Sequence, residues 1–185
     1  LALFVQKGFA ATRAEEVAAR AGVSKGTLYL YYPSKEELLK AVIAHYLSDR
    51  IAEGAAQAAG FSGSATDLLQ GILIDWWTQL YDSPASGVFK LVITEVRNFP
   101  EIARVWHDQV AGKAFDALGA AVAAAQARGE VRPGNPRFFA MSIIGPLVMA
   151  LIWRETFVPV GGAALDMPAL AEQHLRTVMA ARQQS

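Results

Sequence analysis

The sequence predicts an all-α protein, with a short helical part at the N-terminus and a longer helical part after it. Apolar residues recur at helical spacing in successive segments, most clearly from Leu68 to Leu80 and from Val88 to Val96. Helix-breaking residues separate these segments, and no strand pattern occurs after residue 60. We therefore expect five helices in the longer part, over about 68–80, 88–96, 102–128, from 135 onward, and 166–182.

Composition limits the class of protein. The 185 residues suffice for one or two domains with a core, and the formal net charge of zero does not by itself indicate a nucleic-acid partner. Residues 1–50 nevertheless hold seven Lys/Arg against five Asp/Glu. The absence of cysteine excludes disulfides and thiolate metal sites, and together with the lack of a signal peptide it predicts a cytoplasmic protein. Because residue 1 is leucine, we expect helix 1 to be truncated.

The stretch from Thr12 to Tyr31 has the pattern of two short helices joined by a tight turn. Thr12 with Glu15 predicts a capping box, so the first helix should start just after Thr12. Gly22 should end it, and Ser24 is a natural N-cap for a second helix. This is the helix-turn-helix geometry that places a second helix in the DNA major groove. The pattern alone leaves open an ordinary helical hairpin that binds nothing.

The residues around this motif carry a more specific signal. The run Thr27-Leu28-Tyr29-Leu30-Tyr31-Tyr32-Pro33-Ser34-Lys35-Glu36-Glu37-Leu38-Leu39, with Gly8-Phe9 and the run from 18 to 26, resembles the signature of the TetR family of bacterial transcriptional regulators. The resemblance covers residues 1–44 closely. It implies a three-helix helix-turn-helix DNA-binding domain over 1–46, a linking helix over about 34–59, and a helical effector-binding and dimerisation domain over 47–185.

The resemblance also implies roles for individual residues. Lys25, Gly26 and Thr27 should face base edges, with Ser24 capping their helix, and Tyr29 should contact bases or the sugar-phosphate wall. The residues expected to hold phosphates are Thr12, Arg13, Tyr31 and Lys35. Leu30 departs from the family, in which this position is often Arg or another polar residue.

The longer part is rich in aromatic residues, which are typical both of an ordinary core and of a ligand pocket between helices. The family implies an effector pocket, and the candidate lining residues are Trp76, Tyr81, Trp106, His107 and Met149. The apolar stretch 138–153 is short for a membrane span and contains Gly145-Pro146, so we expect a kinked, buried helix and no membrane contact.

We further expect a homodimer formed by the last two helices. The residues expected to supply its apolar faces are Leu147, Val148, Leu151, Leu170, Leu175 and Val178.

Catalytic motifs are missing from the sequence. The three histidines lie on separate predicted helices without metal-ligand spacing, and no Gly-x-Ser-x-Gly elbow or phosphate loop occurs. Asp75 and Glu95 could lie inside the second domain, although an exposed or paired carboxylate is commoner. We therefore expect no enzyme, no catalytic or metal site and no cofactor.

The expected function is a ligand-responsive repressor that binds a near-palindromic operator in double-stranded DNA and responds to an apolar small-molecule effector. The alternative is a helical ligand-binding or interaction protein that has lost DNA binding. Retention of Lys25, Thr27, Tyr29 and Lys35 favours the first.

Overall fold

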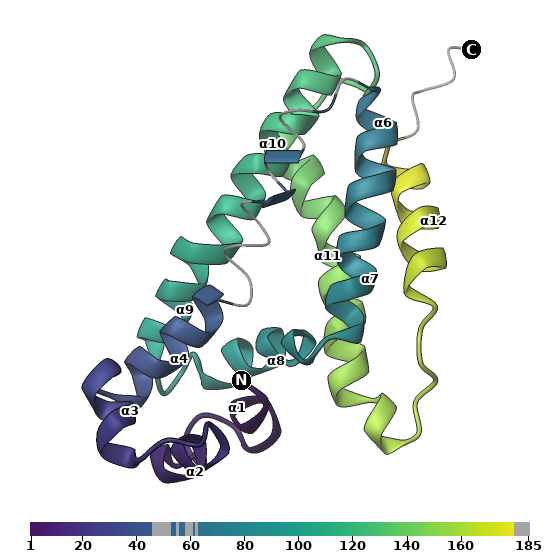
Figure 1. Ribbon diagram of the computed structural model, residues 1–185. Coiled ribbons are helices and arrows are strands. Elements are labelled where there is room, and N and C mark those ends of the chain that lie inside the picture. The colour runs from purple at the N-terminus through teal and green to yellow at the C-terminus, as the bar shows by residue number, and fades with distance from the viewer. Residues whose placement is uncertain (46–52, 55, 58–60, 62, 180–185) are drawn as a thin grey trace.

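In the computed structural model the described residues, which are 1–45, 53–54, 56–57, 61 and 63–179, form helices and connecting turns without a strand (Figure 1). The all-α prediction is confirmed. The N-terminal part contains four short helices: α1 Ala2–Lys7, α2 Ala14–Arg20, α3 Lys25–Tyr31 and α4 Lys35–Ile43. The C-terminal part rises from it as two long helical arms, with α8 crossing between them near their base (Figure 1).

The turn between α2 and α3 forms as the sequence predicts. Gly22 has φ +70, the left-handed conformation that glycine adopts without steric cost. The Ser24 hydroxyl oxygen accepts the Thr27 N–H at 3.0 Å and so caps α3. Leu28, only 7% exposed, anchors the helix in the core. These local signals fix the helix-turn-helix.

The start of α2 differs from the prediction by one residue. Its N-cap is Arg13, whose backbone N–H is accepted by Glu16, and not Thr12 paired with Glu15. Thr12 is turned inward, 1% exposed, and its hydroxyl lies 2.7 Å from the Gly8 carbonyl and 3.1 Å from the Leu3 carbonyl. Tertiary bonds to α1 therefore replace the local cap.

Helix α4 begins at the predicted cap, where the Ser34 hydroxyl oxygen accepts the Glu37 N–H at 3.1 Å. The predicted continuation to about residue 59 falls largely on residues 46–52, 55 and 58–60, which lie outside the described residues, as does the expected domain boundary at 46/47. Glu53, Gly54, Ala56 and Gln57 are helical.

The C-terminal part has the five predicted helical segments. The first runs from α6 Ala65–Leu68 through a π-helical turn into α7 Ile74–Asp82, and α8 Gly87–Glu95 follows. The third joins α9 Pro100–Trp106 and α10 Gly112–Ala127 through a second π-helical turn, His107–Ala111. The last two are α11 Pro136–Thr156 and α12 Met167–Met179.

Helix α11 corrects two expectations. It continues through Gly145 and Pro146 over 21 residues, so it is longer than the short apolar stretch that the sequence indicated. The stretch Pro136–Val160, whose most apolar 18 residues have mean hydropathy 1.6, is also long and apolar enough to cross a membrane by length and composition, although one such stretch is weak evidence. One face of α11 packs into the core, and the other leaves Phe138 70% and Met149 58% exposed.

Most of the residues expected at a dimer interface do not lie on a free surface. Four of the six are in the subunit's own core: Leu147 and Leu151 are 0% exposed, Leu175 is 1% and Val178 is 9%. They pack between α11, α12 and the neighbouring helices, so they stabilise the single chain. The assignment of these four residues is therefore wrong, because an almost uniformly apolar helix gives no periodicity from which to choose its inner face. Val148 and Leu170 are partly buried, and their place in an interface stays a prediction.

Candidate nucleic-acid interface and ligand cavity

Helix α3 presents nearly all of its side chains outward at the far end of the N-terminal part (Figure 1). Lys25, Gly26 and Thr27 are exposed at its first turn, and Tyr29 and Tyr31 are exposed farther along, the latter by 72%. Leu30 is 79% exposed, so the position that departs from the family pattern is also on the free surface. A helix held by one buried residue, with lysine, threonine and tyrosine side chains exposed, is suited to enter a groove rather than to fill a core.

Two helices of the motif are joined by an ion pair. The Lys25 ammonium donates to the Glu15 carboxylate of α2, and it lies 5.7 Å from the centre of the Tyr29 ring. Hydrogen bonding to Glu15 raises the pKa of Lys25, and the same bond holds the pKa of the Glu15 carboxyl below its ordinary value. Lys25 therefore stays charged at the start of α3, but in the protein without DNA the Glu15 carboxylate partly neutralises that charge.

Two residues expected to hold phosphates make hydrogen bonds within the protein. The Thr12 hydroxyl has a single hydrogen, and that hydrogen bonds to carbonyls of the preceding segment. The Lys35 ammonium donates to the Ala10 and Thr12 carbonyls, each at 3.1 Å, and lies 4.5 Å from the Phe9 ring centre. Both side chains thus hold the loop between α1 and α2. Arg13, in contrast, is exposed beside this loop.

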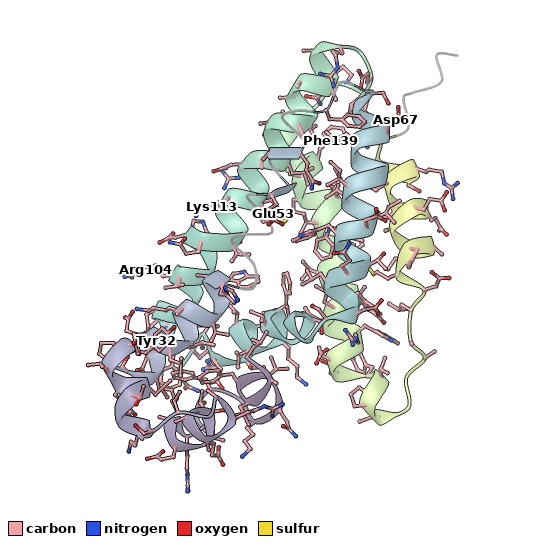
Figure 2. The ribbon with its side chains drawn as sticks, in the orientation of Figure 1. Tyr32, Glu53, Asp67, Arg104, Lys113 and Phe139 are labelled. Carbon is pink, nitrogen blue, oxygen red and sulfur yellow. The ribbon has the colours of Figure 1, made fainter. Side chains whose placement is uncertain are left out.

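A cavity of about 500 Å³, partly open to solvent, lies between α7, α8, α10 and α11. Its described wall is aromatic and aliphatic, without a charged side chain; the larger contributors are Trp76, Trp77, Phe89, Trp106, Phe115 and Ile144. Figure 2 shows Arg104 and Lys113 on the outer side of the α9–α10 arm, and both are exposed. A cavity of this size and composition suits an apolar, drug-sized molecule.

Only two of the five predicted lining residues, Trp76 and Trp106, are in the wall of the cavity. Tyr81 is buried elsewhere, with its hydroxyl oxygen accepting the Leu165 N–H at 3.2 Å. His107 is exposed beside Asp108, and Met149 is on the outer face of α11. These three residues are not in the cavity wall, because the turn of each helix directs their side chains away from it, and a part for them in ligand binding stays a prediction.

The sequence reasoning also missed much of the wall. Phe89 and Val92 are three residues apart on α8, so they face the cavity together. On α10, Ala114, Ala117 and Ala121 share a face whose small side chains leave the space open. This alanine periodicity was available in the sequence, but it is equally typical of close helix packing.

A smaller, polar cleft of about 380 Å³ adjoins the cavity and shares Gly54, Ile72 and Trp76 with it. Glu53 and Asp75 line the cleft, and Figure 2 shows Glu53 between the two arms of the domain. Among the described residues, no group of three or more His, Asp or Glu side chains could hold a metal ion.

The fold and these two sites define a class of protein: a DNA-binding regulator with a helix-turn-helix at one end and a helical ligand domain at the other. The chain belongs to the TetR family of transcriptional regulators. Residues 1–42 match the family model described as "Bacterial regulatory proteins, tetR family", and residues 62–166 match "Tetracyclin repressor-like, C-terminal domain".

The relatives agree with this assignment. The uncharacterised HTH-type regulator YerO of Bacillus subtilis is 49% identical over 45 residues, which is 24% of this chain and only 16% of YerO. The match to the B. subtilis regulator YuxN likewise covers 16% of that protein, so the first relatives are matched over a small part of their length. The B. subtilis regulator YfiR is 26% identical, and the match covers 97% of this chain and 87% of the length of YfiR.

Solved structures share the fold along nearly the whole chain. A TetR-family regulator from Mesorhizobium loti has a TM-score of 0.76 and 21% identity, over 96% of this chain and 89% of its own. FadR from B. subtilis, solved in complex with stearoyl-CoA, has a TM-score of 0.70 and 17% identity, and the match covers 96% of this chain and 92% of the FadR chain.

Proposed function

We propose that this regulator is a cytoplasmic homodimeric repressor that binds a near-palindromic operator and releases it when an apolar effector occupies the cavity. The observation that carries the proposal is the presence, in one chain, of an exposed recognition helix and a 500 Å³ apolar cavity. The relatives and structural neighbours are transcriptional regulators, and we propose no catalytic activity.

The DNA contacts divide between base reading and backbone holding. Lys25, Gly26 and Thr27 open α3 and read base edges, with Tyr29 beside them, while Arg13 and Tyr31 hold phosphates. Thr12 and Lys35 contribute indirectly, because they fix the loop that leads into α2. The outward position of Lys25, Thr27 and Tyr29 supports this function over a helical protein that has lost DNA binding.

The second subunit covers the outer face of α11. The apolar side chains exposed on this face are Phe138, Met149 and Trp153. Their exposure in a single chain is costly, whereas a self-complementary two-fold contact would bury them. Helix α12 flanks this face, and the His174 imidazole is 2.7 Å from the Ser142 carbonyl of α11. The two-fold axis would place both α3 helices in successive major grooves, about 34–36 Å apart.

The effector is apolar over most of its surface. One structural neighbour was solved with stearoyl-CoA, and the present cavity is suited to a hydrocarbon chain of that kind. The adjoining cleft carries Glu53 and Asp75, whose carboxylates would repel a polyanionic head placed there. We therefore favour a ligand without dense negative charge at this side of the cavity.

Selection of bound sequences from random double-stranded DNA, with and without candidate ligands, tests the proposal. We expect a near-palindromic consensus with two half-sites, and its recovery should fall when an apolar ligand is present. Specific operator recognition would be contradicted if unrelated sequences were recovered and all DNA bound with the same salt-sensitive affinity.

A further inference from the structure

Helix α8 contacts the N-terminal part of the chain at both of its ends (Figure 1). At its start, a Cβ on Gly87 would lie 2.1 Å from Val5 Cγ1, so α1 packs directly against this glycine. At its end, the Glu95 carboxylate accepts the Phe9 N–H at 2.8 Å, across 86 residues of sequence. Glu95 is 8% exposed. Helix α8 is therefore a direct connection between the ligand domain and α1.

The segment held by Glu95 leads into the helix-turn-helix. Gly8 has φ +82, and a Cβ there would lie 3.1 Å from Glu95 Oε1, so the backbone approaches the carboxylate closely. Phe9 is fully buried and packs edge-on against Phe99, with ring centres 4.5 Å apart. Lys35 holds the next residues of the same loop. A shift of Glu95 would therefore displace the start of α2.

The same helix forms part of the cavity wall. Phe89, Val92 and Ile93 line the cavity, and Glu95 follows Ile93 by two residues. A ligand that pushes against this wall moves a short, stiff helix whose far end holds the Phe9 amide. Because an unsatisfied buried N–H is costly, the loop and the carboxylate move together unless their hydrogen bond breaks.

We infer that Glu95 is a positioning residue, through which occupation of the cavity changes the placement of the helix-turn-helix. This inference rests on the proposed function. The connection runs from the cavity through α8 to α1, apart from the linking helix expected from the sequence.

The test uses the neutral, apolar dye N-phenyl-1-naphthylamine as a probe of the cavity and the operator obtained by selection. Operator affinity is measured with and without saturating dye for the full chain and for Glu95→Ala, Glu95→Gln and Glu155→Ala. Glu155 is the matched control, because its carboxylate accepts the Ser86 hydroxyl at 2.6 Å beside α8 but does not hold α1. Thermal unfolding of each variant is recorded in parallel.

In the unmodified protein, dye should weaken operator binding by about 5–150-fold, the usual range for such coupling. Glu95→Ala should reduce this factor at least fivefold while leaving dye affinity within twofold. Glu95→Gln retains an acceptor oxygen and should keep most of the coupling, and Glu155→Ala should behave as the unmodified protein. The Phe9 amide of the unmodified protein should stay protected from hydrogen exchange with and without dye, whereas in Glu95→Ala it should exchange faster.

Three results would overturn the inference: full coupling in Glu95→Ala, equal loss in Glu155→Ala, or a Phe9 amide of the unmodified protein that loses its protection when dye binds. Equal loss of coupling in Glu95→Gln would contradict the acceptor role. Failure of the proposed function is distinguishable, since the unmodified protein would then bind dye or operator without any coupling between them.

Discussion

Substitutions at two positions on α11, only two residues apart, should have opposite consequences. Leu147 is 0% exposed and packs in the subunit core, whereas Met149 is 58% exposed on the outer face. Leu147→Ala removes buried methyl groups and leaves a cavity, so it should cost about 2–5 kcal/mol of unfolding free energy. Met149→Ala should change the stability of the single chain by less than about 0.5 kcal/mol, as is usual at an exposed site.

The charged variant at the outer position tests the assembly. Met149→Glu would place a carboxylate in the proposed apolar contact without a partner, so it should give monomers that keep the helical fold. Sedimentation at micromolar concentration measures the oligomeric state, and urea unfolding at two protein concentrations measures the stability. Unfolding of the unmodified dimer should depend on concentration, and unfolding of Met149→Glu should not.

A Met149→Glu variant that sediments as the unmodified protein does would refute the assignment of the outer face. An unmodified protein that is monomeric at micromolar concentration would refute the homodimer itself. If Leu147→Ala leaves the stability unchanged but dissociates the dimer, the two faces of α11 have been assigned in the wrong order.

Three further predictions concern the recognition helix and the cavity. Thr27→Ala should cost about 1–3 kcal/mol of binding free energy on the selected operator and relax the preference at particular base pairs. Arg13→Ala should weaken binding to all sequences alike and lower the slope of log affinity against log salt concentration by about one. Binding titrations at several salt concentrations distinguish the two. Because Lys25 donates to Glu15, the pKa of Glu15 is lowered, so the pair's contribution to stability is present at neutral pH and is lost as the pH falls through that lowered value. Lys25→Met should return the pKa of Glu15 toward its ordinary range in an NMR titration, and an unmoved pKa would contradict the pair. Ala121→Phe should fill part of the cavity, weaken dye binding at least tenfold and leave the helical content unchanged in circular dichroism; unchanged dye affinity would place the ligand elsewhere.

Local chemistry made the helices predictable. Ser24, Ser34 and Asn135 each accept the backbone N–H that their capping role requires, so helix starts could be located from single residues. Gly22 ends the first helix of the motif for an equally local reason. The helix-turn-helix was therefore accessible from its sequence, and family resemblance supplied the expected role of each exposed position.

Tertiary contacts decided what the sequence left undetermined. Thr12 is a residue type that commonly caps helices, but its hydrogen bonds to the Leu3 and Gly8 carbonyls turn the side chain inward. Helix α11 is apolar on nearly all sides, so its pattern could not show that Leu147 faces the core and Met149 does not. Glu95 meets Phe9 across 86 residues, a distance over which helical periodicity carries no information.

The measurement that tests the account most directly is a reciprocal titration of ligand and operator. The affinity of the apolar dye is measured with and without the selected operator, and the affinity of the operator is measured with and without saturating dye. The account predicts that each weakens the other by the same factor, about 5–150-fold, because linkage between two binding sites is reciprocal. Identical dye affinity in the presence and absence of operator would contradict it.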